Sequence, residues 1–223
     1  MNILLLGGSG VIGNGINNIL CKKYNVTILN SGTYERYKNQ YHLNKKIKFD
    51  TFIHAAGVTD EEINHYGQES SIKRSSEALK KLLNQLALNN CKNFVYISSQ
   101  RVYLNFYRTN KAIFNETRSK VKSTTVYEKC HLLSENIFKK ISKRKNFRSL
   151  IIRPGVVYGI PNHKKISRPN LIQHAFLNSL IKGDDIKIQS SGKQYRNFSL
   201  NEDVGKIIFN WMNIESNKKF TIS

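Results

Sequence analysis

A string of glycines lies directly between a short apolar segment and a helical pattern at the start of the chain. Ile3 to Leu6 is a continuous apolar run, which is typical of a strand buried on both faces. The next residues, Gly7 to Gly13, spell Gly-Gly-Ser-Gly-Val-Ile-Gly and satisfy the spacing G-x-G-x-x-G. Apolar residues then recur at helical spacing from Ile12 to Leu20. This order of strand, glycine turn and helix constrains the fold more than any other feature of the sequence.

The glycine turn has a physical use at the start of a helix. Without side chains, Gly7 and Gly10 let the backbone turn and approach an anion, and Gly13 lets the helix lie close to the strand. The first helical residues, Val11 and Ile12, add free N–H donors and the positive end of the helix dipole. The pattern predicts a pyrophosphate site for a dinucleotide, with a plain glycine-rich turn as the alternative.

Strand and helix patterns alternate along the rest of the chain. The expected strands are 25–29, 49–56, 94–98 and 149–153, and the expected helices are about 70–88 and 126–142. This alternation predicts an α/β fold, a doubly wound Rossmann-type parallel sheet. Few residues separate Asn30 from His54, so one crossover unit is expected to be abbreviated.

Candidate site residues fall where the predicted strands end. Ligands of parallel sheets bind at the carboxyl ends of the strands. Gly7, His54, Ser99 and Pro154 all occupy such ends, and the small Ala55 and Ala56 leave room for a cofactor. The sequence therefore predicts a single shared site along this edge of the sheet.

The end of the second expected strand bears on the kind of dinucleotide. An acidic residue about 20 positions beyond the glycines usually binds the adenosine ribose. Here that place holds Asn30 and Ser31, with Arg36 and Lys38 nearby. An amide does not repel a 2′-phosphate, so the sequence favours NADP slightly over NAD; a simple turn at Asn30 is the alternative.

Composition limits the class of protein. The 223 residues carry a formal net charge of +21. This charge either attracts a polyanion or belongs to a solvated surface whose lysine content reflects codon bias. No recognised nucleic-acid motif is present, so no nucleic acid is expected as a partner. No apolar stretch reaches the ~18 residues of a membrane span. Three scattered cysteines fit neither a disulfide framework nor a metal site, and we expect a cytoplasmic protein.

Several motifs resemble the extended short-chain dehydrogenase/reductase superfamily, and within it the NAD(P)-dependent epimerase/dehydratase family that modifies nucleotide sugars. The similar segments are Gly7–Gly13, His54–Gly57, Val95–Ser99 with Val102-Tyr103, Tyr127, Arg153–Gly159, Tyr195–Phe198 and Asp203-Val204. The resemblance covers about residues 1–215 in the family's order. It implies a dinucleotide-binding domain at 1–160 and a substrate-binding lobe at 161–223 that is either small or shortened, interleaved with the first.

The resemblance also implies catalytic roles. The family uses a Ser or Thr, a Tyr that exchanges a proton with the substrate, and a Lys four positions after the Tyr. Ser99 and Tyr127 match the first two, whereas the Lys position holds His131, which would bind the nicotinamide ribose. An imidazole carries less charge than Lys near neutral pH, so an enzyme with altered pH behaviour, a weakened enzyme and a cofactor-binding protein without turnover remain alternatives. Tyr107 to Lys111 also has Tyr-x-x-x-Lys spacing, in a polar segment, and is interpreted as a chance match.

The remaining expectations concern substrate and assembly. By the resemblance, Ser99, Gln100, Val156 and Arg196 would line the substrate side, with the Arg196 guanidinium on a diphosphate. The predicted function is a nucleotide-sugar epimerase, dehydratase or 4-ketoreductase, serving surface polysaccharide biosynthesis. The alternative is a regulatory or scaffold protein that binds NAD(P) without catalysis. The two long helices resemble those of a family homodimer.

Overall fold

The computed structural model describes residues 1–29, 34–35, 40–41, 43, 48–103, 114–116, 118–145, 147–160, 172–186, 188, 191, 196–214 and 220–222. Its strands are β1 (Asn2–Leu6), β2 (Asn25–Leu29), β3 (Tyr34–Glu35), β4 (Gln40–Tyr41), β5 (Thr51–His54), β6 (Asn93–Ile97), β7 (Arg148–Ile152), β8 (Val156–Tyr158), β9 (Phe198–Leu200) and β10 (Phe220–Ile222). Its helices are α1 (Val11–Leu20), α2 (Asp60–Tyr66), α3 (Gln68–Lys73), the π-helical turn η2 (Arg74–Ala78), α4 (Leu79–Leu88), the 3₁₀ turn η3 (Gln100–Val102), α5 (Val126–Lys145), α6 (Ile172–Lys182) and α7 (Asn201–Asn213).

A six-stranded sheet with the order β10-β7-β6-β5-β1-β2 forms the centre of the molecule. Every neighbouring pair in it is parallel. The predicted doubly wound α/β fold is therefore confirmed. The chain passes from the edge strand β2 to β5, beside β1, by a connection that lies partly outside the described residues, so an abbreviated crossover stays a prediction. In between, the described residues hold only the short antiparallel pair of β3 and β4.

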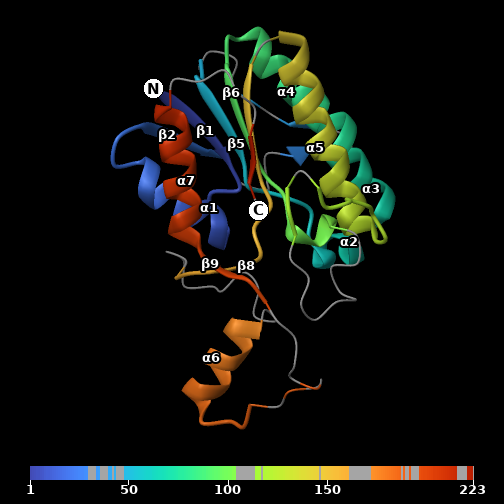
Figure 1. Ribbon diagram of the computed structural model, residues 1–223, viewed down its shortest axis with the longest axis vertical. Coiled ribbons are helices and arrows are strands. Elements are labelled where there is room, and N and C mark those ends of the chain that lie inside the picture. Colours follow the sequence, from blue (N-terminus) through green and yellow to red (C-terminus); the bar gives the residue numbers. More distant parts are fainter. Residues whose placement is uncertain are drawn as a thin grey trace.

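Helices cover both faces of this sheet (Figure 1). On one face α1 and α7 pack over a core that includes Ile16, Leu20, Ile208 and Trp211. On the other face α4 and α5 cover a second core, which includes Leu82 and Phe138. Strands with both faces buried are the reason for the nearly continuous apolar runs in the sequence.

The C-terminal part of the chain contributes to two regions. Helix α7 packs against α1, and β10 pairs with β7 at the edge of the main sheet. In Figure 1, α6 lies apart from the sheet, beyond the parallel pair of β8 and β9. A division into domains at 1–160 and 161–223 stays a prediction.

The helix expected at about 70–88 is built from three consecutive segments, α3, η2 and α4. The π-helical turn η2 widens the helix at Arg74–Ala78, and such turns often occur at functional sites. It is not visible in the apolar spacing, which α4 alone carries with Leu79, Leu82, Leu83 and Leu86 buried. Among the described residues, no helix combines the length and apolar character that a bilayer crossing requires.

Candidate active site

The glycine turn forms a cradle made of backbone atoms, at the start of α1. Gly7 has a φ of 90°, and its N–H donates to the Leu29 carbonyl at 2.8 Å. A Cβ on Gly13 would overlap the carbonyl oxygen of Gly7. These two positions therefore require glycine, one for its backbone conformation and one for the close approach of helix to turn. We call Gly7, Gly10, Gly13 and the first turn of α1 the glycine cradle.

The start of α1 is electrostatically suited to an anion. Gly10 is the N-cap and offers no side-chain acceptor, and the first turn, Val11 to Asn14, holds no acidic residue. The free N–H groups and the positive end of the helix dipole can therefore bind an anion in the cradle, because no carboxylate of the first turn competes for them. Asn201 fixes α1 from the other side, because its side chain donates to the Val11 carbonyl at 2.9 Å.

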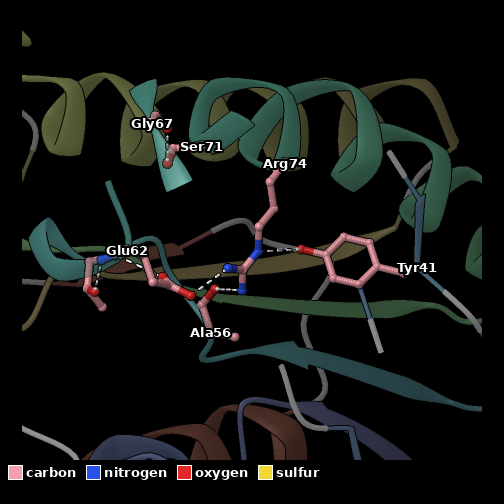
Figure 2. Close-up of polar contacts among 7 residues, drawn as sticks. Tyr41, Ala56, Glu62, Gly67, Ser71 and Arg74 are labelled. Atoms are coloured by element: carbon pink, nitrogen blue, oxygen red, sulfur yellow. Dashed lines mark hydrogen bonds and ion pairs between the residues drawn. The ribbon is translucent and has the colours of Figure 1, made fainter. Parts of the chain in front are cut away.

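The segment after β5 closes the cradle. The Ala55 N–H donates to the Leu6 carbonyl at 2.8 Å, and Ala56 packs directly against Gly7. Figure 2 shows Arg74 from η2 reaching into this region. Its guanidinium donates to the Ala56 carbonyl at 3.3 Å, to Glu62 at 2.7 Å and to the Tyr41 hydroxyl at 3.3 Å.

Arg74 thereby joins the β4 strand, helix α2 and the end of β5. Its side chain is only 11% exposed, so the ion pair with Glu62 is largely shielded from water. Glu62 is itself held by a capping box with Thr59, in which each residue's side chain accepts from the other's N–H. Sequence reasoning missed Arg74, and nothing in its immediate sequence could have indicated the contact.

A second group of side chains lies around Tyr127, near the start of α5. The Tyr127 and His131 rings are 4.5 Å apart between centroids, as expected for positions i and i+4 on one helix face. The Arg101 guanidinium carbon lies 3.9 Å from the centroid of the Tyr127 ring. Arg101 also forms an ion pair with Asp60 at 2.6 Å. We call Tyr127, His131, Arg101 and Tyr96 the tyrosine cluster.

His131 is buried, with 4% of its surface exposed. Its Nδ1 lies 2.7 Å from the Tyr96 hydroxyl, while its Cε1–Nε2 edge faces Gly57. A Cβ on Gly57 would lie 2.7 Å from His131 Cε1, so this glycine leaves the room that the imidazole occupies. Burial raises the pKa of Tyr96 well above its ordinary value, so the phenol keeps its proton. The contact with Tyr96 fixes the orientation of the His131 ring.

His54 lies beneath this cluster at the end of β5. Its ring meets Tyr96 edge to face, with centroids 5.4 Å apart. Burial, together with the neighbouring Arg74 and His131, lowers the pKa of His54 to about 3. Its buried Nδ1 has no hydrogen-bond partner in the part of the chain that the structure describes. His54 is therefore a neutral imidazole at physiological pH.

Ser99, at the carboxyl end of β6, is connected to the cluster through η3. Its Oγ accepts from the Arg101 N–H at 3.2 Å, so Ser99 caps the turn that carries Arg101, the residue that covers Tyr127. The neighbouring Ser98 donates from its hydroxyl to Glu135 at 2.7 Å. The backbone N–H of Gln100 donates to the Pro154 carbonyl at 3.0 Å, which ties this turn to the end of β7.

A buried ion pair stabilises the edge of the sheet at which β6 and β7 end. Arg153 donates two hydrogen bonds to Glu135 of α5, at 2.8 and 2.7 Å, and both side chains are at most 3% exposed. Burial by itself would raise the pKa of Glu135, but Arg153, Ser98 and Lys139 outweigh it and hold this pKa below its ordinary value. This pair fixes α5 against β6 and β7, and sequence reasoning did not single it out.

The other predicted residues are placed as follows. Gly155 lies beside the Gln100 side chain, which is buried, and Val156 pairs with Phe198 between β8 and β9. Arg196 is exposed and directly precedes this strand pair. Asn30, Ser31, Arg36, Lys38 and the segment from Tyr107 to Lys111 lie outside the described residues. The predicted effect of the first four residues on the choice between NADP and NAD therefore stays a prediction. So does the interpretation of Tyr107 to Lys111 as a chance match.

Similar folds occur in solved structures of nucleotide-sugar epimerases. A UDP-N-acetylglucosamine 4-epimerase from Methanobrevibacter ruminantium, in complex with UDP-N-acetylmuramic acid, has a TM-score of 0.80 and 19% identity, over 100% of this chain and 76% of that one. A UDP-glucuronic acid 4-epimerase from Bacillus cereus, in complex with UDP-glucuronic acid and NAD, has a TM-score of 0.76 and 16% identity, over 100% and 77%. A UDP-glucose 4-epimerase from Thermotoga maritima, with UDP-glucose, has a TM-score of 0.74 and 17% identity, over 100% and 76%.

These identities show the fold alone. No curated protein matches the chain by sequence. The model of one protein family, however, matches residues 3–222, which is nearly the whole chain and includes both the glycine cradle and the tyrosine cluster. The chain therefore belongs to the NAD dependent epimerase/dehydratase family.

Proposed function

We propose that this protein is an NAD(P)-dependent enzyme that acts on a nucleotide sugar, as an epimerase, dehydratase or 4-ketoreductase. The observation that carries the proposal is the position of the glycine cradle and the tyrosine cluster along one edge of a parallel sheet. Such an edge is where doubly wound folds bind their ligands. The complexes of similar fold with UDP-sugars and NAD support the same class of substrate and cofactor.

The cradle fits the pyrophosphate of a dinucleotide. Bare backbone at Gly7 and Gly10 admits close approach, and the first turn of α1 supplies N–H donors without an acidic competitor. Ala55 and Ala56 would border the cofactor, and His131 would contact its ribose through the Cε1–Nε2 edge that faces Gly57. When bound, the nicotinamide would supply reversible hydride exchange with a sugar carbon.

The chain's own residues would move the proton. Tyr127 would give or take it at the sugar oxygen on the same carbon, and Ser99 would orient that oxygen. Gln100 and Val156 would border the sugar, and Arg196 would contact the diphosphate, where a guanidinium fork suits phosphate oxygens. A place in surface polysaccharide biosynthesis, a homodimer through the α4 and α5 region, a cytoplasmic location and the preference for NADP remain parts of this proposal.

Ligand-induced stabilisation tests the proposal first. NAD, NADH, NADP and NADPH are added singly to the protein, and then together with UDP-, GDP-, CDP- and dTDP-sugars, while the melting temperature is measured. A ligand present at 100 times its Kd stabilises the native state by about 2.7 kcal/mol. We expect one dinucleotide to stabilise the protein and one nucleotide sugar to add to that effect. No shift with any dinucleotide would refute the proposal.

Turnover with the sugar so identified then tests Tyr127. The Tyr127→Phe variant should lose about 10²- to 10⁴-fold in kcat, because it lacks the proton donor. Tyr24→Phe is the matched control. Tyr24 directly precedes the amino-terminal end of β2, and its hydroxyl donates a hydrogen bond to the Asn213 side chain. Loss of this hydroxyl should leave the activity unchanged.

The alternative is a regulatory or scaffold protein that binds NAD(P) without catalysis. The observation that favours it is His131, which stands in place of a lysine and whose Nδ1 is engaged by Tyr96. A melting-temperature shift with a dinucleotide, no further shift with any nucleotide sugar and no turnover would establish this alternative.

A further inference from the structure

The tyrosine cluster contains a positive charge that the family motif does not provide. A tyrosine acts as a proton-transfer group near neutral pH only if its phenolate form is stabilised, for which a nearby cation is the usual means. His131 is poorly suited to that task. It is buried, its Nδ1 is engaged by Tyr96, and burial disfavours the charged form of an imidazole.

Arg101 lies where such a charge is needed. Its guanidinium carbon is 3.9 Å from the centroid of the Tyr127 ring, well within the distance of a cation–π contact. A guanidinium is always charged, and its side chain here is only 22% exposed, which limits screening by water. The turn η3 fixes the residue's backbone, because the Arg101 N–H donates to Ser99 and the flanking Gln100 and Val102 are buried.

Asp60 on α2 is the counter-charge of this arginine. Its Oδ2 lies 2.6 Å from Arg101 Nη1, and its side chain is 57% exposed. Within the described residues, titratable groups near Tyr127 include His131 and Cys130 on its own helix and Tyr96 on β6, while Arg74 on η2 lies near Cys130. Arg74 is directed to Glu62 and the Ala56 carbonyl, whereas the Arg101 guanidinium lies directly on the Tyr127 ring.

We propose that Arg101 is a positioning residue for Tyr127: its guanidinium stabilises the phenolate form and replaces the charge that a lysine at position 131 would supply. His131 then keeps only the hydrogen-bonding part of that position. This inference rests on the proposed function for its meaning in catalysis, but the electrostatic effect exists in the protein without any ligand.

The test measures the phenol of Tyr127 directly in the full-length protein. The protein is labelled with 3-fluorotyrosine, and its ¹⁹F resonances are followed by NMR as a function of pH. The Tyr127 resonance is identified by its loss in Tyr127→Phe. The variants are Arg101→Gln, which removes the cation, Asp60→Asn, which removes its counter-charge, and Arg101→Lys, which keeps a charge without the planar guanidinium.

The two neutral substitutions break the same ion pair but should move the pKa of Tyr127 in opposite directions. Arg101→Gln should raise it by about one unit or more, since an adjacent opposite charge shifts a pKa by about 1–3 units. Asp60→Asn should lower it, and Arg101→Lys should fall between wild type and Arg101→Gln. A purely structural ion pair predicts shifts of the same sign, or none, for the first two variants, and that result would overturn the inference.

The same variants separate this inference from the proposed function. Asp60→Asn alters an exposed side chain and keeps the test decisive if Arg101→Gln does not fold. In an active enzyme, the pH profile of kcat/KM should move with the pKa of Tyr127 in each variant. Opposite pKa shifts without turnover of any nucleotide sugar would support the role of Arg101 and count against the enzyme function alone.

Discussion

The glycine cradle and the tyrosine cluster lie on the same edge of the sheet but are built in different ways. The cradle consists of backbone atoms and missing side chains, all within one strand–turn–helix. The cluster consists of side chains from α5, η3 and β6, held in place by α2 and by the ion pair between Arg153 and Glu135. The cradle therefore depends on local sequence, whereas the cluster depends on the packing of distant elements.

Removal of the buried Glu135 carboxylate should have the largest effect on the free energy of unfolding. Glu135→Gln leaves Arg153 buried and without its counter-charge, which typically costs about 3–5 kcal/mol of unfolding free energy. Urea denaturation measures this cost. The control is Lys139→Gln, because Lys139 contacts the same carboxylate from a side chain that is 43% exposed, and about 1 kcal/mol or less is expected. Equal losses in the two variants would show that the cluster does not depend on this ion pair.

The cradle should respond to a single methyl group. Gly13→Ala places a Cβ against the Gly7 carbonyl, where only backbone movement can relieve the overlap, and about 1–3 kcal/mol of stability should be lost together with dinucleotide binding. In Gly10→Ala the Cβ would lie 3.5 Å from the same oxygen, an ordinary contact. That control should cost about 1 kcal/mol or less. Urea denaturation and calorimetric titration with NAD compare the two variants, and equal stability losses would contradict the geometry of the turn.

Acid should destabilise the folded protein through protonation of His54, which packs against the tyrosine cluster. Its pKa is lowered from 6.5 to about 3 in the folded protein, so the unfolded chain binds more protons between these values. This contribution to stability is therefore fully present well above pH 6.5 and is lost as the pH falls, by about 1.2 kcal/mol between pH 6 and 5. In His54→Phe this part of the pH dependence should disappear, whereas His65→Gln, on the exposed surface, should keep it. The melting temperatures of the wild type and both variants are measured over this pH range. If the melting temperature of His54→Phe falls with pH as steeply as that of the wild type, His54 is not the cause.

The sequence predicted those parts of the site that local pattern determines. Apolar runs located the ends of β1, β5, β6 and β7, and thereby Gly7, His54, Ser99 and Pro154, while the spacing of four placed His131 on the face of Tyr127. The stacking of Arg101 on Tyr127, the contact of Tyr96 with His131 and the reach of Arg74 to Ala56 were not predicted. Each joins residues of different elements, and no periodicity records which side chains meet when those elements pack.

The order of the strands in the main sheet also affects how the protein behaves at high concentration. It leaves β2 at the edge of the main sheet, and in the described residues this strand pairs with β1 alone, while its Ile28 is 40% exposed. An edge strand offers unpaired N–H and C=O groups to a neighbouring molecule. The net charge of +21 opposes such an encounter through mutual repulsion, and salt screens that repulsion over about 8–10 Å. The protein should therefore remain dispersed in dilute buffer and begin to associate, edge to edge, as the ionic strength rises.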